Sequence, residues 1–215
     1  MTEERTKVVV PQPVLKRLPR YLNYLKGKKK EGLERISSTM ISADLGLNSV
    51  QVRKDLACVS DCGKPRTGFD LHMLIRDIEH FLGYGNTKDA VLVGAGNLGR
   101  TLLAYEGFAG YGLNILAAFD IDEKLADTEV HGKRIFPVHR LPEMTERLCA
   151  SIGIITVPAA CAQEICDLLV AGGVKGIWNF APTHLEAPEN IIIQNEDIAA
   201  SLALLSNRLA ERERG

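Results

Sequence analysis

The stretch that decides the fold of this chain is Gly94-Ala95-Gly96-Asn97-Leu98-Gly99. It follows an apolar run over residues 90–93 and leads into a helix-like segment over residues 100–105. A second apolar run, residues 113–119, ends at Asp120. Strand, glycine-rich turn, helix, strand and acid follow one another in the order that a dinucleotide site requires. A tight turn without a ligand is the alternative interpretation.

Each glycine of the turn has a separate expected role. Gly94 allows the tight turn, Gly96 lets the backbone approach a pyrophosphate, and Gly99 lets helix and strand pack closely. The helix N-terminus then presents free N–H groups to the phosphates. Asp120 is placed to accept hydrogen bonds from the adenine-ribose hydroxyls, and its charge repels a 2′-phosphate. We therefore expect NAD or NADH as the cofactor.

Composition places the chain among ordinary globular proteins. Its 215 residues are 46% hydrophobic and 25% charged, enough for one or two domains with proper cores. No apolar run approaches the roughly 18 residues of a membrane helix, and the N-terminus lacks a signal segment. We expect a cytoplasmic protein without a membrane partner. The five cysteines lack CxxC spacing and a nearby histidine pair, which predicts free thiols and no metal.

Charge is divided unevenly along the chain. Residues 1–80 carry 15 Lys and Arg against 10 Asp and Glu, whereas residues 81–215 carry 11 against 17. A basic module joined to an acidic one suggests a polyanionic partner for the first.

The basic part has the pattern of a helix-turn-helix. Apolar residues recur at helical spacing over residues 14–25, where Pro19 is expected to kink the helix or to start a new turn within it. A polar, basic break is expected at residues 26–30. A helix over residues 40–45 ends at Gly46, and a second, over residues 50–59, begins after Asn48 or Ser49. Two helices joined by a short turn with glycine predict this motif.

The second of these helices is expected to enter the DNA major groove with its N-terminal residues. Its buried side is predicted to consist of Val50, Val52 and Leu56. A basic loop over residues 62–69 would form a wing. The residues expected to contact DNA bases or phosphates are Ser49, Gln51, Arg53, Lys54, Lys64 and Arg66. A helical dimerisation domain without DNA is the alternative.

The remainder predicts a doubly wound parallel sheet of the Rossmann type. Strands are expected at residues 135–138, 151–157, 176–180 and 190–194, and helices at 71–82, 141–148, 162–172 and 197–212. Because ligands bind beyond the carboxyl ends of such strands, the residues expected near the cofactor include Val157, Pro158, Asn179 and Phe180. The expected domains are a winged helix over residues 1–84, the sheet over 85–196 and a C-terminal helix over 197–215.

An enzyme is not expected, because no catalytic group has an obvious partner. His131, His139 and His184 each stand alone in predicted loops. Two alternatives stay open: a small NAD-dependent oxidoreductase, and a thiol-based redox regulator that uses Cys58 and Cys62.

Several motifs resemble the Rex family of redox-sensing transcriptional repressors over nearly the whole chain. They include QVRKDL at residues 51–56, the glycine turn, Phe119-Asp120 and NFAP at residues 179–182. The resemblance implies a homodimer with an N-terminal winged helix and a C-terminal helix swapped between subunits. It also implies binding to palindromic double-stranded operator DNA, with release by NADH and binding permitted by NAD+.

The family's residues carry over by position. Tyr105 would pack beside the nicotinamide across the dimer. Arg17, Tyr105 and Asp197 would form the contacts that report the cofactor state, and Arg17 would also serve DNA binding. The segment over residues 57–69, which includes the wing, departs from the family, because it carries Cys58, Cys62 and Pro65 in place of an aromatic-glycine repeat.

Overall fold

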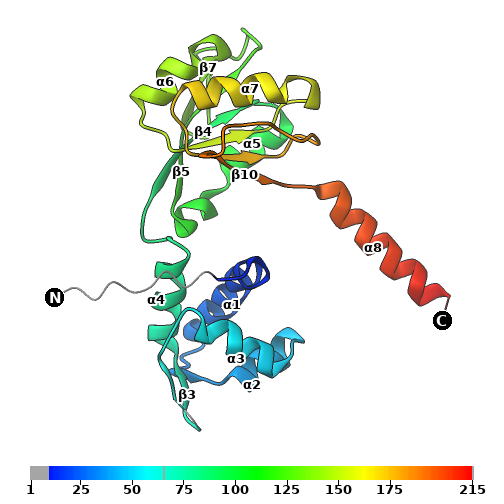
Figure 1. Cartoon of the computed structure of the whole chain (residues 1–215). Coiled ribbons are helices and arrows are strands. Elements are labelled where there is room, and N and C mark those ends of the chain that lie inside the picture. The colour runs from blue at the N-terminus through cyan, green and yellow to red at the C-terminus, as the bar shows by residue number, and fades with distance from the viewer. Residues whose placement is uncertain (1–9, 65, 215) are drawn as a thin grey trace. The chain divides into compact units, whose positions relative to one another are not determined.

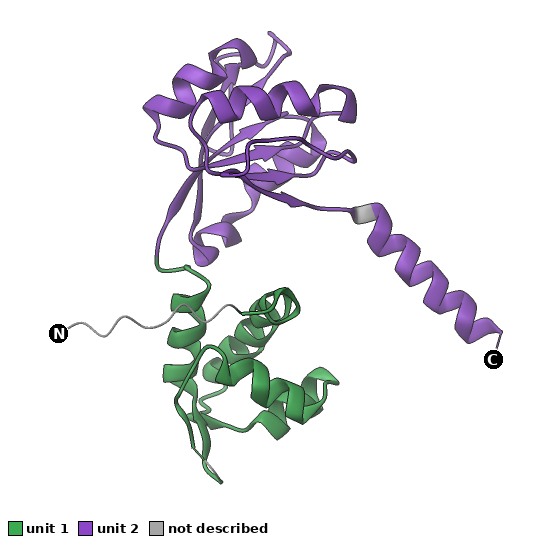
Figure 2. Ribbon diagram, viewed as in Figure 1, with its two compact units in different colours: residues 1–85 green, residues 86–215 purple. Residues whose placement is uncertain are grey.

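The computed structural model describes residues 10–64 and 66–214, without the side chain of residue 198. The chain divides into two compact units, Met1–Gly85 and Asn86–Gly215 (Figure 2). Each unit has its own hydrophobic core.

The first unit is a winged helix-turn-helix. Its elements are α1 (Gln12–Lys30), β1 (Arg35–Ile36), α2 (Ser38–Leu45), α3 (Ser49–Ala57), β2 (Gly63–Lys64), β3 (Gly68–Asp70) and α4 (Leu71–Phe81) (Figure 1). Ser37 caps α2 by accepting from the Met40 N–H, and Gly46 ends it in the left-handed conformation. Asn48 caps α3, the second helix of the motif. The three short strands form an antiparallel sheet in the order β1-β3-β2. The predicted motif and wing are confirmed.

Two details of the sequence prediction are wrong in this unit. Residues 26–30 continue α1 instead of breaking it, since three lysines in the last turn complement the negative end of the helix. Val50 is 47% exposed, while Val52 and Leu56 are fully buried. Val50 precedes Val52 by two residues, about 200° around a helix, so it faces the opposite side. Asp55 takes the remaining buried position.

A buried acidic residue joins α3 to α1. The Asp55 carboxylate is 3% exposed and accepts from Arg17 Nε at 2.6 Å and Arg17 Nη2 at 2.8 Å. The Tyr21 hydroxyl donates to the same carboxylate at 2.7 Å. Burial, followed by this hydrogen bond, raises the pKa of Tyr21 to about 12. The cluster therefore holds the orientation of α3 against α1.

The second unit is a doubly wound α/β domain, as expected. In chain order its elements are β4 (Lys88–Val93), α5 (Asn97–Ala104), the 3-10 helix η1 (Glu106–Tyr111), β5 (Leu113–Asp120), β6 (Glu129–Val130), β7 (Lys133–Pro137), the 3-10 helix η2 (Val138–Arg140), α6 (Leu141–Arg147), β8 (Ile152–Ile155), α7 (Ala159–Ala171), β9 (Gly176–Asn179), β10 (Ile192–Asn195) and α8 (Ile198–Glu213). The sheet order is β10-β9-β8-β4-β5-β7-β6, and only the short edge strand β6 is antiparallel to its neighbour. The sequence pattern did not reveal β6.

The central strand β4 has buried side chains on both faces of the sheet, because successive residues of a strand point to opposite faces. Val91 and Val93 belong to a core that includes Leu169 of α7, whereas Ala90 and Leu92 belong to one that includes Leu103 of α5. Figure 1 shows α6 and α7 over one face of the sheet. Burial on both faces explains why the strands read as continuous apolar runs.

The C-terminal helix α8 carries an exposed apolar stripe. Asp197 caps its N-terminus by accepting from the Ala200 N–H at 2.8 Å. Its exposed leucines are Leu202, Leu204, Leu205 and Leu209. The side chain of Ile198 lies outside the described residues. Apolar residues at this spacing are typical of a helix that packs against another surface.

Replacing Asp55 with Ala should lower the stability of the first unit by about 2–3 kcal/mol, because Arg17 and Tyr21 lose a charged hydrogen-bond acceptor. Urea unfolding followed by far-UV circular dichroism measures the change. Asp61→Ala, which removes an exposed carboxylate of the same unit, is the control. Equal stability of the two variants would show that the cluster contributes nothing.

Candidate functional site

The glycine turn lies where the order of the sheet reverses. The chain passes from β4 to β5 on one side and later to β8 on the other, so the turn after β4 lies at the switch point. Gly94 has a φ of 101°, and a Cβ there would lie 2.8 Å from the Thr156 carbonyl oxygen. A Cβ on Gly99 would overlap the carbonyl oxygen of Gly94. These two glycines are required by the turn and by the packing of α5.

Gly96 differs from the other two glycines. A Cβ added there would meet nothing within 4 Å, so the backbone faces open space. Gly96 is the N-cap of α5 and offers no side-chain cap. The first N–H groups of α5, at Asn97 and Leu98, have no intrahelical acceptor by the geometry of a helix start. This open cradle of N–H donors fits a pyrophosphate.

Asp120, at the end of β5, is bonded to the glycine turn. One carboxylate oxygen accepts from the Ala95 N–H at 2.6 Å, and the other accepts from the Asp122 N–H at 2.9 Å. Each carboxylate oxygen keeps a lone pair for a further donor. The carboxylate thus both orders the turn and can accept a ribose hydroxyl.

A cavity of about 250 Å³ opens beside Asp120. Val157 and Pro158, both expected near a cofactor, line it together with Gly94, Gly96 and Asp120. Sequence reasoning missed several apolar and polar wall residues after β5 and on α7, namely Ile121, Cys161, Glu164, Ile165 and Leu168. The carboxyl ends of the parallel strands indicated the edge of the sheet where the cavity lies. No sequence signal identified the face of α7 that closes the cavity.

Asn179 and Phe180 lie outside the wall of this cavity. The Asn179 side chain is buried, donates to Ala181 O, Thr183 O and Asn195 Oδ1, and accepts from the Ala181 N–H. It therefore holds the turn that follows β9 to the end of β10. The Phe180 ring packs on the Trp178 ring, with centroids 4.8 Å apart.

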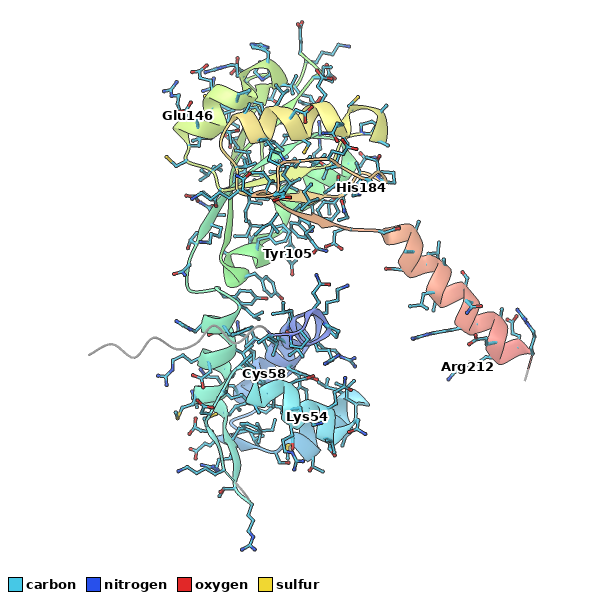
Figure 3. All side chains as sticks on the ribbon, in the orientation of Figure 1. Lys54, Cys58, Tyr105, Glu146, His184 and Arg212 are labelled. Carbon is cyan, nitrogen blue, oxygen red and sulfur yellow. The ribbon has the colours of Figure 1, made fainter. Side chains whose placement is uncertain are left out.

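The three residues implied as a switch each have partners within their own unit. Tyr105, labelled in Figure 3, follows α5, is 53% exposed and contacts the Phe108 ring edge-on at 4.8 Å. Asp197 caps α8. Arg17 is paired with Asp55 inside the winged helix.

The residues expected to contact DNA are exposed on two neighbouring elements. Ser49, Gln51, Arg53 and Lys54 lie on the exposed side of α3, where Figure 3 labels Lys54. Lys64 and Arg66 are exposed in the wing, and Arg66 has a left-handed φ of 65°. A groove of about 660 Å³ joins Arg53, Lys64 and Arg66 to the start of α2. Pro65, the unusual proline of the wing, lies outside the described residues.

The cysteines of the first unit make local contacts, and the described residues hold no metal-binding group. Cys58, labelled in Figure 3, follows the end of α3 and donates to the Lys54 carbonyl at 3.2 Å, and the Cys62 Sγ lies 2.9 Å from Ser60 Oγ. All five cysteines are free. No group of three or more His, Cys, Asp and Glu side chains could hold a metal in the part of the chain described. Within the same residues, no helix is long and apolar enough to cross a membrane.

Comparison with known families matches both units. The family described as "CoA binding domain" matches residues 86–183, and the one described as "Putative DNA-binding protein N-terminus" matches residues 9–57. A protein of Bacteroides fragilis named redox-sensing transcriptional repressor Rex is 40% identical, over 96% of this chain and 94% of its own. The chain belongs to the Rex family. A Treponema denticola Rex is also 40% identical, over 90% of this chain and 92% of its own.

Solved structures of this family share the fold of both units. The Rex-family repressor RSP, in a complex with β-NAD+ and operator DNA, is 34% identical to this Rex-family chain, with a TM-score of 0.90 and coverage of 95% and 94% of the two chains. RSP with β-NADH gives a TM-score of 0.86 at 33% identity, covering 95% of this chain and 96% of its own.

The glycines of the turn should differ in their effect on stability. Gly99→Ala should destabilise the second unit by about 1–3 kcal/mol, because its Cβ would overlap the Gly94 carbonyl. Gly96→Ala should cost less than about 1 kcal/mol, because its Cβ would enter open space. Urea unfolding followed by fluorescence of the single tryptophan, Trp178 in β9, measures both. A cost for Gly96→Ala as large as that for Gly99→Ala would contradict the described turn.

Proposed function

We propose that this Rex-family chain is a transcriptional repressor that binds palindromic operator DNA and senses the NADH/NAD+ ratio. The observation that carries the proposal is the combination, in one chain, of a winged helix with an exposed basic face and an open dinucleotide-type turn. Its relatives are named repressors, and RSP has been solved with operator DNA and with both forms of the cofactor. A repressor of chromosomal genes acts in the cytoplasm.

The cofactor-binding residues proposed for this chain surround the turn and cavity. The backbone of Gly94, Ala95, Gly96, Asn97, Leu98 and Gly99 would hold the pyrophosphate. Asp120 would accept from the adenine ribose, and Val157 and Pro158 would cover the adenosine half. When bound, the nicotinamide is cationic as NAD+ and neutral as NADH, and this difference in charge is the signal. A dry, apolar pocket beside Tyr105 would favour the neutral ring, because burial of an unpaired charge is costly.

Two of the expected binding residues take supporting roles in this proposal. Asn179 would shape the loop after β9 from inside, since its side chain is fully occupied. Phe180 would contribute to the aromatic cluster with Trp178. Arg17 would serve DNA binding by fixing the recognition helix through Asp55, in addition to any contact it makes in the switch.

The DNA-binding residues follow from exposure on α3 and the wing. Gln51, Arg53 and Lys54 would reach base edges in the major groove, and Ser49 would contact the backbone at the helix start. Lys64 and Arg66 would follow the phosphates or the minor groove. A homodimer would place two such modules on a palindrome, and the exposed leucines of α8 support packing of this helix against a second subunit. By linkage, operator DNA must weaken NADH binding by the factor by which NADH weakens operator binding.

Fluorescence anisotropy of a labelled palindromic Rex-type operator tests the proposal. We expect operator affinity to fall about tenfold or more between NAD+ and NADH at fixed salt and under reducing conditions. NADPH should have little effect, because Asp120 repels the 2′-phosphate. Operator affinity that ignores the NADH/NAD+ ratio would contradict the proposal.

Two sets of variants distinguish a response to NADH from a response of the Cys58 and Cys62 thiols. Gly96→Ala should bind NADH at least tenfold more weakly, because its methyl group occupies the space that the pyrophosphate approaches. This variant should therefore stay bound to operator DNA when NADH is present. Gly110→Ala, where a Cβ also meets open space, is the matched control. The double variant Cys58→Ser and Cys62→Ser should keep the NADH response. Loss of the NADH response in this double variant would favour the thiol-based regulator instead.

A further inference from the structure

A continuous series of aromatic contacts starts at Tyr105 and crosses to β9. The Tyr105 ring meets Phe108 of η1 edge-on at 4.8 Å, and Phe108 meets Trp178 of β9 edge-on at 5.7 Å. The Trp178 ring in turn packs on Phe180 at 4.8 Å. Aromatic pairs in these geometries are directional, so a displaced Tyr105 ring changes the packing of the rings behind it. The exposed end of this series is the end of α5, the helix that begins at the glycine turn.

Trp178, within this series, is hydrogen-bonded to Glu196, which precedes the N-cap of α8. The indole N–H of Trp178 donates to Glu196 Oε1 at 2.9 Å. The Glu196 N–H donates to the Asn179 carbonyl at 2.8 Å, so backbone and side chain of Glu196 are both held by β9. The next residue, Asp197, is the cap of α8. The Trp178 ring and the backbone of β9 thus both hold the residue before the cap of α8.

We infer that Trp178 and Glu196 are positioning residues that couple the cofactor end of the domain to the C-terminal helix. The inference rests on the proposed function and adds to it an intrachain connection between Tyr105 and Asp197. A shift of Tyr105 moves Phe108 and Trp178, which weakens or strengthens the indole–carboxylate hydrogen bond. Because that bond is to a charged acceptor in a half-buried site, it holds Glu196 more strongly than a neutral one would. The start of α8, and with it Asp197, is thereby biased toward one of two orientations.

The experiment compares four variants in the full chain. Trp178→Phe keeps an aromatic ring and removes the N–H donor. Glu196→Ala removes the acceptor, whereas Glu196→Gln keeps an amide oxygen that can accept. Glu189→Ala, an exposed glutamate in the loop before β10, is the matched control. The measured quantity is the coupling factor, defined as operator affinity in saturating NAD+ divided by that in saturating NADH.

We expect Trp178→Phe and Glu196→Ala to reduce the coupling factor by about tenfold. Glu196→Gln should restore most of it, and Glu189→Ala should leave it unchanged. NADH affinity measured without DNA should stay within about threefold of the unmodified chain in all four, since none of these residues lines the cavity. The emission of Trp178 should shift in Glu196→Ala and remain near its original position in Glu196→Gln, which a general loss of stability would not produce.

The outcomes separate this inference from the proposed function. If the unmodified chain is released by NADH and all four variants show the same coupling factor, the inference is overturned and the proposed function stands. If Trp178→Phe or Glu196→Ala loses coupling only because NADH affinity collapses, the positioning role is also overturned. An unmodified chain that ignores NADH overturns both.

Discussion

The close approach of α5 to the turn after β4 is the contact on which the second unit depends. Gly99 lies against the Gly94 carbonyl so tightly that even a methyl group has no room. This approach sets the direction of α5, and the direction of α5 aims its first N–H groups at the open space beside Gly96. Asp120 supports the same turn through the Ala95 N–H. One close contact thus sets the direction of the N–H donors, and the same turn lines the adjacent cavity.

The first unit depends on a different interaction, a buried carboxylate that accepts three hydrogen bonds from two residues. Asp55 occupies a core position of the recognition helix, where an apolar residue would pack as well. Its bonds to Arg17 and Tyr21 give α3 one orientation against α1. This orientation matters for the proposed function, because a recognition helix reads bases in the major groove only at the correct angle. Gln51, Arg53 and Lys54 are the residues proposed to make those contacts.

A response of DNA binding to the cofactor requires a connection between the cofactor site of the second unit and the recognition helices. The aromatic series from Tyr105 to Trp178 and the bond from Trp178 to Glu196 lead from the end of α5 to the start of α8. The leucines of α8 are exposed in the single chain. Exposed leucines on one helix are typical of a helix that packs against another surface. Under the proposed function, a change at the start of α8 in a dimer would alter how the two subunits, and hence the two recognition helices, are spaced.

The sequence by itself determined the helix-turn-helix with its wing, the doubly wound sheet, the glycine turn and the acid after the second strand. These features depend on local chemistry: caps such as Asn48, periodic apolar residues, and glycines at strained or crowded positions. The exposure of Val50 follows from the helical period once Val52 and Leu56 are buried. Tertiary structure alone decided that Asn179 stabilises the loop from inside the fold, that α7 closes the cavity, and that Trp178 reaches Glu196. Each of these depends on which side chains meet across elements distant in the chain, and hydrophobic period or local propensity carries no information about such meetings.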